Sequence, residues 1–320
     1  MATPAKLGFI GLGAMGFPMA SNLISKSAKG SQLFIYDVSE ASMSRFAEKH
    51  PNSTVVCKSP AEVSSSADIL FTMLPEGAHV KSVYLDPATG VLHDGMAAKI
   101  LVDCSTIDVD TSLLVLDAVR QSKSHSGVSF FDAPVSGGTL GAEKGSITIM
   151  LGIAEQHDPV YPVLLPLLQL MGKHIVPCGK PGMGLTAKLC NNYCSGLIAL
   201  ATAEAMNIGI RSGMDPRLLA RVFSSSTAQS TICDTWNPVP GVVPAAPSSH
   251  GYQGGFKVQL MAKDFGLAMQ AAAKAEATTL LGPAGLDAYR KAAQDPNCYD
   301  RDSRVVFRYI GGDEKWQEKL

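Results

Sequence analysis

The stretch GFIGLGAMG, residues 8–16, decides the fold, because it joins an apolar run to three spaced glycines. Residues 7–10, LGFI, have the pattern of a buried strand, and Gly11, Gly13 and Gly16 follow at the start of a helical pattern. In this context the three glycines of Gly-x-Gly-x-x-Gly serve, in order, a tight turn, the close approach of a pyrophosphate, and helix–strand packing. The pyrophosphate would bind at the helix N-terminus, where N–H groups without partners and the helix dipole favour anions. The stretch therefore predicts a strand–turn–helix unit that binds a dinucleotide, with a plain tight turn as the alternative.

Asp37 ends the second predicted strand, 21 residues after Gly16. A carboxylate at this position accepts hydrogen bonds from the adenosine ribose and repels a 2′-phosphate. The next residues, Val38, Ser39 and Glu40, offer no arginine or lysine that would hold such a phosphate. The sequence therefore favours NAD over NADP.

The first half of the chain repeats the alternation of strand and helix. Its largely apolar runs are typical of strands that are buried on both faces of a parallel sheet. These runs are residues 6–13, 31–38, 67–74, 98–105 and 128–135. Helical stretches such as 14–28 and 39–50 lie between them, and the alternation predicts a doubly wound sheet with right-handed crossovers. Runs 146–152 and 174–179 are expected as late additions to it, with antiparallel pairing as one arrangement.

The pattern changes at residues 178–184, after which no strand is expected. Residues 185–212 are apolar on nearly every side of a helix, which is typical of a core element shared with another domain or subunit. Shorter helical patterns follow at 215–225, 257–276 and 283–293. The second half is therefore expected to be all α.

Residues 237–256 interrupt this helical half with four prolines and four glycines. Irregular segments of this length are uncommon inside compact domains and are usually functional or disordered. A solvated linker would carry more charge than this segment, in which His250 is the one residue that can be charged near neutral pH. We expect an ordered lid or interface loop, with a disordered segment as the alternative.

The composition, with 46% hydrophobic and 17% charged residues, is that of a soluble globular protein and excludes a disordered chain. A net charge of −1 gives no electrostatic footprint for nucleic acid or an anionic membrane. No uninterrupted apolar run reaches the roughly 18–20 residues that span a bilayer. Only MATPAK, residues 1–6, stands at the start of the first strand, and this is too short for a signal or transit peptide.

The seven cysteines are odd in number and form no Cys-x-x-Cys pair, which indicates reduced thiols in an intracellular compartment. Cys190 and Cys194 are four residues apart on the long predicted helix, without a histidine nearby to complete a zinc site. We therefore expect small packing residues there and no metal.

Two further stretches carry candidate chemistry. The stretch DAPVSGG, 132–138, ends a predicted strand in Ser136, Gly137 and Gly138, whose unhindered N–H groups and hydroxyl suit a carboxylate, although an ordinary loop is the alternative. In GLTAKLCNN, 184–192, the helical spacing puts Lys188 and Asn192 on one face. A lysine there is either a cleft-facing acid–base group or a side chain whose stem lies along apolar surface with its head in water.

Together these motifs resemble the β-hydroxyacid dehydrogenase family, particularly its 3-hydroxyisobutyrate branch. GFIGLGAMGFPMASNL (8–23) resembles the cofactor signature, DAPVSGG the substrate loop, GLTAKLCNN the catalytic helix and MAKDFGLA (261–268) the fourth family block. The likeness extends to residues 202–216 and to NPVPGV, 237–242, and so covers essentially the whole chain. The resemblance implies an α/β fold class: an N-terminal Rossmann-type domain, residues 1–182, joined by a long central helix to an all-α domain, residues 183–320, with the substrate between them.

The resemblance also implies the roles of individual residues. Lys188 would be the catalytic acid–base. The substrate would be held by Ser136, Gly137, Gly138, Asn192 and Lys263. The cofactor would be held by Gly11, Gly13, Ala14, Met15, Gly16, Asp37, Leu74, Pro75, Thr106, Lys263 and Asp264. Relatives of this branch tend to have asparagine where His79 stands, which puts that contact with NAD in doubt.

The activity that the resemblance implies is oxidation of the primary alcohol of 3-hydroxyisobutyrate to methylmalonate semialdehyde, a step of valine breakdown, with NAD taking the hydride and neutral Lys188 taking the proton. Lys263 and the oxidised nicotinamide are positive charges that would disfavour the charged form of that lysine. Tartronate semialdehyde or 4-hydroxybutyrate chemistry is the alternative within enzymes, and a redox-inactive cofactor-binding protein is the alternative outside them. The apolar long helix predicts a homodimer or homotetramer, with no nucleic acid or membrane as partner. The resemblance implies the mitochondrial matrix, and the missing presequence leaves the cytoplasm as the alternative.

Overall fold

The structure is a computed structural model that describes residues 5–154 and 158–319 of the 320-residue chain. Residues 1–4, on which the expectation about a presequence depends, lie outside the described part. The chain forms two compact units, residues 1–188 and residues 189–320, each of which has its own core. The domain boundary expected from the sequence, after residue 182, lies six residues before the division between these two units, and it stays a prediction.

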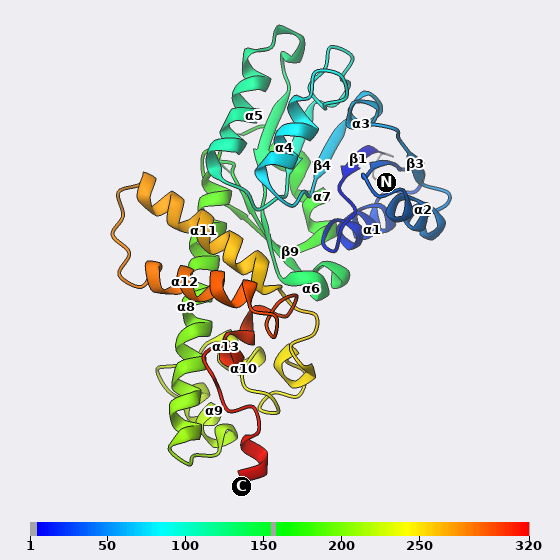
Figure 1. Cartoon of the computed structure of the whole chain (residues 1–320). Coiled ribbons are helices and arrows are strands. Elements are labelled where there is room, and N and C mark those ends of the chain that lie inside the picture. Colours follow the sequence, from blue (N-terminus) through cyan, green and yellow to red (C-terminus); the bar gives the residue numbers. More distant parts are fainter. Residues whose placement is uncertain (1–4, 155–157, 320) are drawn as a thin grey trace. The chain divides into compact units, whose positions relative to one another are not determined.

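A six-stranded parallel sheet forms the centre of the first unit (Figure 1). Its strands are β1 (Lys6–Ile10), β2 (Gln32–Tyr36), β3 (Thr54–Val56), β4 (Ile69–Thr72), β5 (Ile100–Asp103) and β6 (Ser129–Asp132). They lie in the order β3-β2-β1-β4-β5-β6, so the direction of winding reverses between β1 and β4. This strand order is that of the Rossmann fold, and it confirms the predicted fold class. The short edge strand β3, of three residues, was not predicted.

Helices cover both faces of this sheet because neighbouring residues of each strand point to opposite sides. The helices are α1 (Gly16–Lys26), α2 (Glu40–Lys49), α3 (Pro60–Ser66), α4 (Gly77–Leu85) and α5 (Val109–Gln121), with a 3-10 turn, η1, at Lys123–His125. Phe9 of β1 packs in one core with α1 and α2, whereas Ile10 packs in another core with α3, α4 and α5. Both cores are apolar, which is why the strands appear as continuous hydrophobic runs rather than alternating ones.

A second, three-stranded sheet follows, in the region where additions to the first sheet were expected. It consists of β7 (Val135–Ser136), β8 (Ile147–Leu151) and β9 (Gly172–Pro177), and it is accompanied by α6 (Gly138–Lys144) and α7 (Tyr161–Met171). β7 pairs antiparallel with β8, and β8 pairs parallel with β9. The expectation was wrong on the sheet: β6 ends at Asp132, and Pro134, two residues later, has no N–H to continue the ladder.

The second unit is helical, as expected. α8 (Met183–Arg211) begins in the first unit, and it is followed by α9 (Pro216–Ser225), α10 (Thr231–Thr235), η2 (Pro247–His250), α11 (Val258–Lys274), α12 (Gly282–Gln294), η3 (Ser303–Val305), α13 (Val306–Tyr309) and η4 (Trp316–Lys319). One isolated bridge joins Lys257 to Asp302, and no strand occurs between 189 and 319. Phe265 lies at the centre of the core, within ring-contact distance of Tyr193 and Tyr289.

Residues 237–256 are ordered, which agrees with one half of the expectation for them. Asn237, Ser248 and Tyr252 are buried, and the Tyr252 hydroxyl donates to the Pro238 carbonyl at 2.9 Å. The Ser248 hydroxyl donates to the Asn237 carbonyl at 2.6 Å, which holds the middle of the segment against its start. Its role as a lid or interface stays a prediction.

Helix α8 has the length and composition of a membrane-spanning helix, although no uninterrupted apolar run in the sequence is that long. The core helix of a soluble protein has the same properties, and α8 carries the buried polar residues Lys188 and Asn192. Cys190 and Cys194 on this helix are exposed in the single chain, so they do not pack inside it as the expectation of small packing residues implies.

Candidate active site

The glycine-rich loop between β1 and α1 has the geometry that its sequence predicts. Gly11 has a φ of +94°, and a Cβ there would overlap the Met73 carbonyl oxygen. A Cβ on Gly16 would overlap the Gly11 carbonyl oxygen. The first turn of α1 can therefore pack this closely against the loop only if residue 16 is glycine. A Cβ on Gly13, in contrast, would meet no atom of the described residues within 4 Å. The middle glycine is therefore the open one, as a loop that lets a phosphate come close to its backbone requires.

The Asp37 carboxylate is held in place by backbone groups on both sides. Leu12 N–H donates to Asp37 Oδ2 at 2.5 Å, and Ser39 N–H donates to Oδ1 at 2.7 Å. Asp37 thus fixes the glycine-rich loop to the end of β2, and each oxygen keeps a lone pair for a ligand.

A hollow of about 450 Å³ opens beside Asp37, and it includes Lys58 from the segment after β3. Lys58 was not predicted near Asp37, because without the fold only the residues that directly follow Asp37 can be placed beside it. Val38, which also lines this hollow, is 91% exposed.

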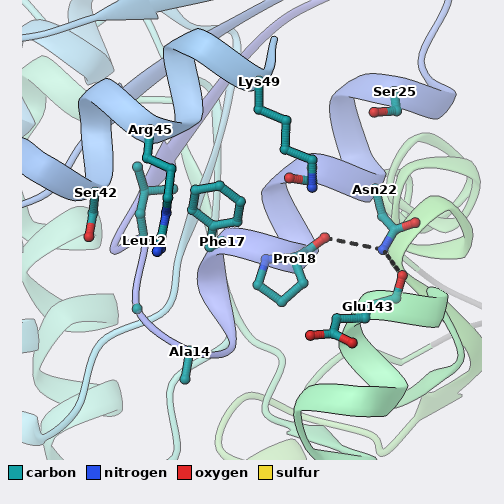
Figure 2. Close-up of a pocket in the computed structure, with 12 residues that line it drawn as sticks. Leu12, Ala14, Phe17, Pro18, Asn22, Ser25, Ser42, Arg45, Lys49 and Glu143 are labelled. Carbon is teal, nitrogen blue, oxygen red and sulfur yellow. Dashed lines mark hydrogen bonds between the residues drawn. The ribbon is translucent and has the colours of Figure 1, made fainter.

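A larger hollow of about 850 Å³ lies beside Gly13 and Ala14, between α1 and α2 (Figure 2). Two cations of α2 cover the Phe17 ring: the Arg45 guanidinium carbon lies 4.5 Å from its centroid and Lys49 Nζ lies 5.4 Å away. These residues add positive charge next to the loop expected to bind phosphate. They were not predicted, although their spacing of four on a predicted helix places them on one face.

Three polar residues align at the carboxyl edge of the main sheet. Thr72 of β4, Asp103 of β5 and Asp132 of β6 are register partners, and all three are buried. Ligands of doubly wound sheets bind at this edge, beyond the ends of the strands. The loops that follow these strands carry the predicted residues Leu74, Pro75, Thr106 and Ser136–Gly138.

Asp103 organises the two loops on the cofactor side of that edge. Its Oδ1 accepts hydrogen bonds from the Thr72 hydroxyl at 2.7 Å and from the Ser105 hydroxyl at 2.5 Å. Ser105 Oγ in turn accepts from Leu74 N–H at 2.8 Å. Burial raises the pKa of Asp103 to about 6, and its Oδ2 has no hydrogen-bond partner among the described residues. Asp103 was not predicted, because no recognisable sequence motif surrounds it at the end of its strand.

The predicted carboxylate site at Ser136–Gly138 is an open turn. Gly137 and Gly138 have φ values of +137° and +64°, which side chains rarely adopt. A Cβ on Gly138 would meet nothing within 4 Å in the described part of the chain, so the backbone there is accessible.

Lys188 lies in the second turn of α8 and belongs to the first unit. Its side chain is buried, with 6% of the residue's surface exposed. This low exposure argues against the alternative from the sequence, a lysine whose head stands in bulk water, and the acid–base role stays a prediction.

The remaining candidates come together in the second unit. Asn192, one turn after Lys188 on α8, donates from Nδ2 to Asp264 Oδ2 at 2.6 Å. Lys263 Nζ lies 3.2 Å from Asp264 Oδ1. His79 is exposed on the first turn of α4, and its contact with a cofactor stays a prediction. No group of three potential metal-binding side chains occurs in residues 5–154 and 158–319.

Comparisons with known proteins agree with this geometry. Residues 6–179 match the family model of the NAD-binding domain of 6-phosphogluconate dehydrogenase. Residues 182–310 match the model described as NAD-binding of NADP-dependent 3-hydroxyisobutyrate dehydrogenase. The mitochondrial 3-hydroxyisobutyrate dehydrogenase of Mus musculus is 41% identical over 98% of this chain and 89% of its own length. The 3-hydroxyisobutyrate dehydrogenase of Pseudomonas aeruginosa is 35% identical over 90% of this chain and 92% of its own length.

Among solved structures, the 3-hydroxyisobutyrate dehydrogenase of Mycobacterium tuberculosis with L-serine has a TM-score of 0.83 and 33% identity. The match covers 96% of this chain and 99% of that one. The resemblance drawn from the four sequence blocks is thereby confirmed over nearly the whole chain. The chain belongs to the 3-hydroxyisobutyrate dehydrogenase family and is a hydroxyacid oxidoreductase that uses NAD(P).

Proposed function

We propose that the enzyme oxidises 3-hydroxyisobutyrate to methylmalonate semialdehyde, with NAD as the cofactor and Lys188 as the acid–base group. The observation that carries the proposal is the buried lysine in the second turn of α8, a helix that starts at the carboxyl edge of a sheet with an open glycine-rich loop. A buried ammonium is costly, so a lysine in this position is suited to exchange its proton during a reaction.

The residues of the first unit fit a dinucleotide. Gly13 leaves the backbone open for the pyrophosphate, and Asp37 is positioned to accept hydrogen bonds from the adenosine ribose. NAD, when bound, supplies the acceptor for the hydride that leaves C3 of the substrate. Neutral Lys188 takes the hydroxyl proton, so that the C–H and O–H bonds of the alcohol are replaced by the carbonyl bond of the aldehyde.

The substrate carboxylate is proposed to bind at Ser136–Gly138, where the backbone is open, and Asn192 is proposed to bind the same substrate from α8. The names of the mouse and bacterial relatives support 3-hydroxyisobutyrate itself. L-serine, present in the mycobacterial structure, is also a short 3-hydroxy acid and supports the substrate class.

The test is a panel of short hydroxyacids with NAD and with NADP, followed at 340 nm. We expect the highest kcat/KM for 3-hydroxyisobutyrate with NAD. A higher kcat/KM for L-serine, for 4-hydroxybutyrate or for the reduction of tartronate semialdehyde would identify that compound as the substrate instead. No turnover with any compound of the panel would support a redox-inactive cofactor-binding protein.

The biological setting is proposed from the relatives. Oxidation of 3-hydroxyisobutyrate is a step of valine breakdown, and the mitochondrial name of the mouse relative supports the matrix over the cytoplasm. Ile208, Leu218 and Val222 are exposed apolar side chains of the second unit, which supports a homodimer or homotetramer. Light scattering of the purified enzyme and fractionation of cells that express it test these two proposals.

A further inference from the structure

The first turn of α8 has a cap that comes from a distant strand. Thr186 N–H donates to the Gly182 carbonyl at 3.0 Å, so Gly182 is the N-cap residue, but glycine has no side chain to accept from the first helical N–H groups. The Asp132 carboxylate, at the end of β6, does so instead. Leu185 N–H donates to Asp132 Oδ2 at 2.8 Å, and Gly182 N–H donates to Oδ1 at 2.7 Å.

One carboxylate thus accepts both hydrogen bonds of a capping box. In that motif the N-cap side chain accepts from the third helical residue, while the side chain of that residue accepts from the N-cap N–H. Here both donors belong to the start of α8, and both acceptors belong to a residue that lies 50 positions before Gly182. The first turn of the helix is therefore attached to the carboxyl edge of the sheet.

The site around Asp132 is built to enclose this carboxylate. The residue is 1% exposed, and its backbone carbonyl accepts from Gly152 N–H at 2.8 Å, which fixes the strand end. A Cβ on Gly152 would overlap Asp132 Oδ1, and a Cβ on Gly184 would lie 2.9 Å from Oδ2. Two glycines from separate segments therefore leave the space that the carboxylate fills.

We infer that Asp132 is a positioning residue for Lys188. The lysine lies three residues after Leu185, so the hydrogen bonds of Asp132 set the position and axial rotation of the turn that carries the amine. Asp132 is also the register partner of Asp103, which organises the loops expected to hold the cofactor. One edge of the sheet thereby fixes the proposed proton acceptor and the proposed cofactor loops in a common frame. The inference rests on the proposed function of Lys188.

The effect of this attachment on the rate follows from the demands of proton transfer. A displacement of about 1 Å in a reacting group can lower a rate by about 100-fold. The first N–H groups of a helix have no intrahelical acceptors, so without Asp132 the first turn of α8 would be free to fray. Lys188 would then still be able to accept a proton, but its amine would no longer be held at the position that proton transfer requires.

The variant that tests the inference is Asp132→Asn, which keeps the shape of the side chain but replaces one acceptor oxygen by an N–H donor. We expect kcat to fall about 10- to 100-fold while the Kd for NAD, from fluorescence titration, stays within about twofold. Hydrogen exchange of the peptide 182–190 should become at least about tenfold faster. Asp103→Asn is the matched control, since it alters the neighbouring buried carboxylate without touching α8, and the exchange of this peptide should remain at the wild-type rate.

A double-mutant cycle separates a positioning role from a general structural one. If Asp132 acts through Lys188, Asp132→Asn should cause no further loss of kcat in the Lys188→Ala background. Additive losses, or a folded Asp132→Asn enzyme with wild-type kcat and wild-type exchange, would overturn the inference. Should Asp132→Asn not fold, Gly152→Ala displaces the same carboxylate and must pass the same cycle. If Lys188→Ala itself kept its turnover, the proposed function would fail first, and the exchange data would still report the cap.

Discussion

At the scale of single residues, Lys188 is the group on which the proposed chemistry depends most directly. Replacement by alanine should lower kcat by about 10² to 10⁴, the usual contribution of one positioned proton-transfer group. Arginine should be no better, because a guanidinium does not release its proton near neutral pH. Oxidation requires the neutral amine, so its rate should rise with pH, whereas reduction of the aldehyde should be faster at lower pH. Steady-state kinetics in both directions measure this.

Lys180→Ala is the matched control for that experiment, since Lys180 is exposed and precedes α8. It should leave kcat and both pH profiles unchanged. Near-normal turnover of a folded Lys188→Ala enzyme would make the lysine a binding residue and would turn attention to Lys263.

The cofactor preference also depends on single residues, Asp37 and Lys58. Asp37 would meet a 2′-phosphate with like charge, so kcat/KM should favour NAD by about tenfold or more, at about 1.4 kcal/mol per decade. Asp37→Ser with Val38→Arg should narrow this ratio. Because Lys58 lines the same hollow, adding Lys58→Ala to that variant should widen the ratio again. Equal efficiency of the wild type with both cofactors would contradict the role of Asp37.

At the scale of elements, the turn between β7 and α6 offers a comparison of two glycines. Gly138 and Gly127 both have positive φ, +64° and +80°, and a Cβ on either would meet nothing within 4 Å in the described part of the chain. Alanine at each position should therefore cost a similar strain of about 1–2 kcal/mol. Only Gly138→Ala should raise KM for the hydroxyacid, about tenfold or more, because only this turn is proposed to bind the carboxylate.

Thermal unfolding and NAD titration complete that comparison. The two variants should lose similar stability, and both should bind NAD like the wild type. If Gly138→Ala also lost NAD affinity, or if Gly127→Ala raised KM to the same extent, the turn would not be a specific carboxylate site.

At the scale of the whole molecule, Asp103 links stability to pH. Its pKa is raised from 3.8 to about 6 because the buried site disfavours the carboxylate anion. A folded-state pKa above the unfolded value means that the folded state holds the proton more tightly, so this residue lowers the free energy of unfolding as pH rises between about 4 and 6. The rise corresponds to on the order of 3 kcal/mol.

Urea denaturation of the wild type and of Asp103→Asn at pH 4.5 and 7.5 tests this link. The asparagine cannot ionise, so the wild type should be favoured relative to the variant at pH 4.5 and should lose most of that advantage at pH 7.5. Parallel stability profiles of the two proteins over this range would show that the Asp103 carboxylate is not perturbed by burial.

Much of this molecule follows from local patterns in its sequence. The glycine spacing after LGFI and the continuous apolar runs were sufficient to predict the parallel sheet. A strand that is buried on both faces needs apolar residues at successive positions, and this pattern can be recognised in the sequence. In the same way, the helical second half follows from its periodicity, and Lys188 and Asn192 follow from a spacing of four on one helix. The predicted residues of the glycine-rich loop all lie within one short stretch of the sequence.

Only the tertiary structure decided which distant residues meet. Asp132 caps α8 across 50 positions, Lys58 joins the hollow beside Asp37, and β7, β8 and β9 form a sheet of their own. A local pattern encodes which faces are buried, but the order of strands in the sheet and the path of the loops determine which side chains become neighbours. That is the physical reason why the elements could be predicted from the sequence and the cap of α8 could not.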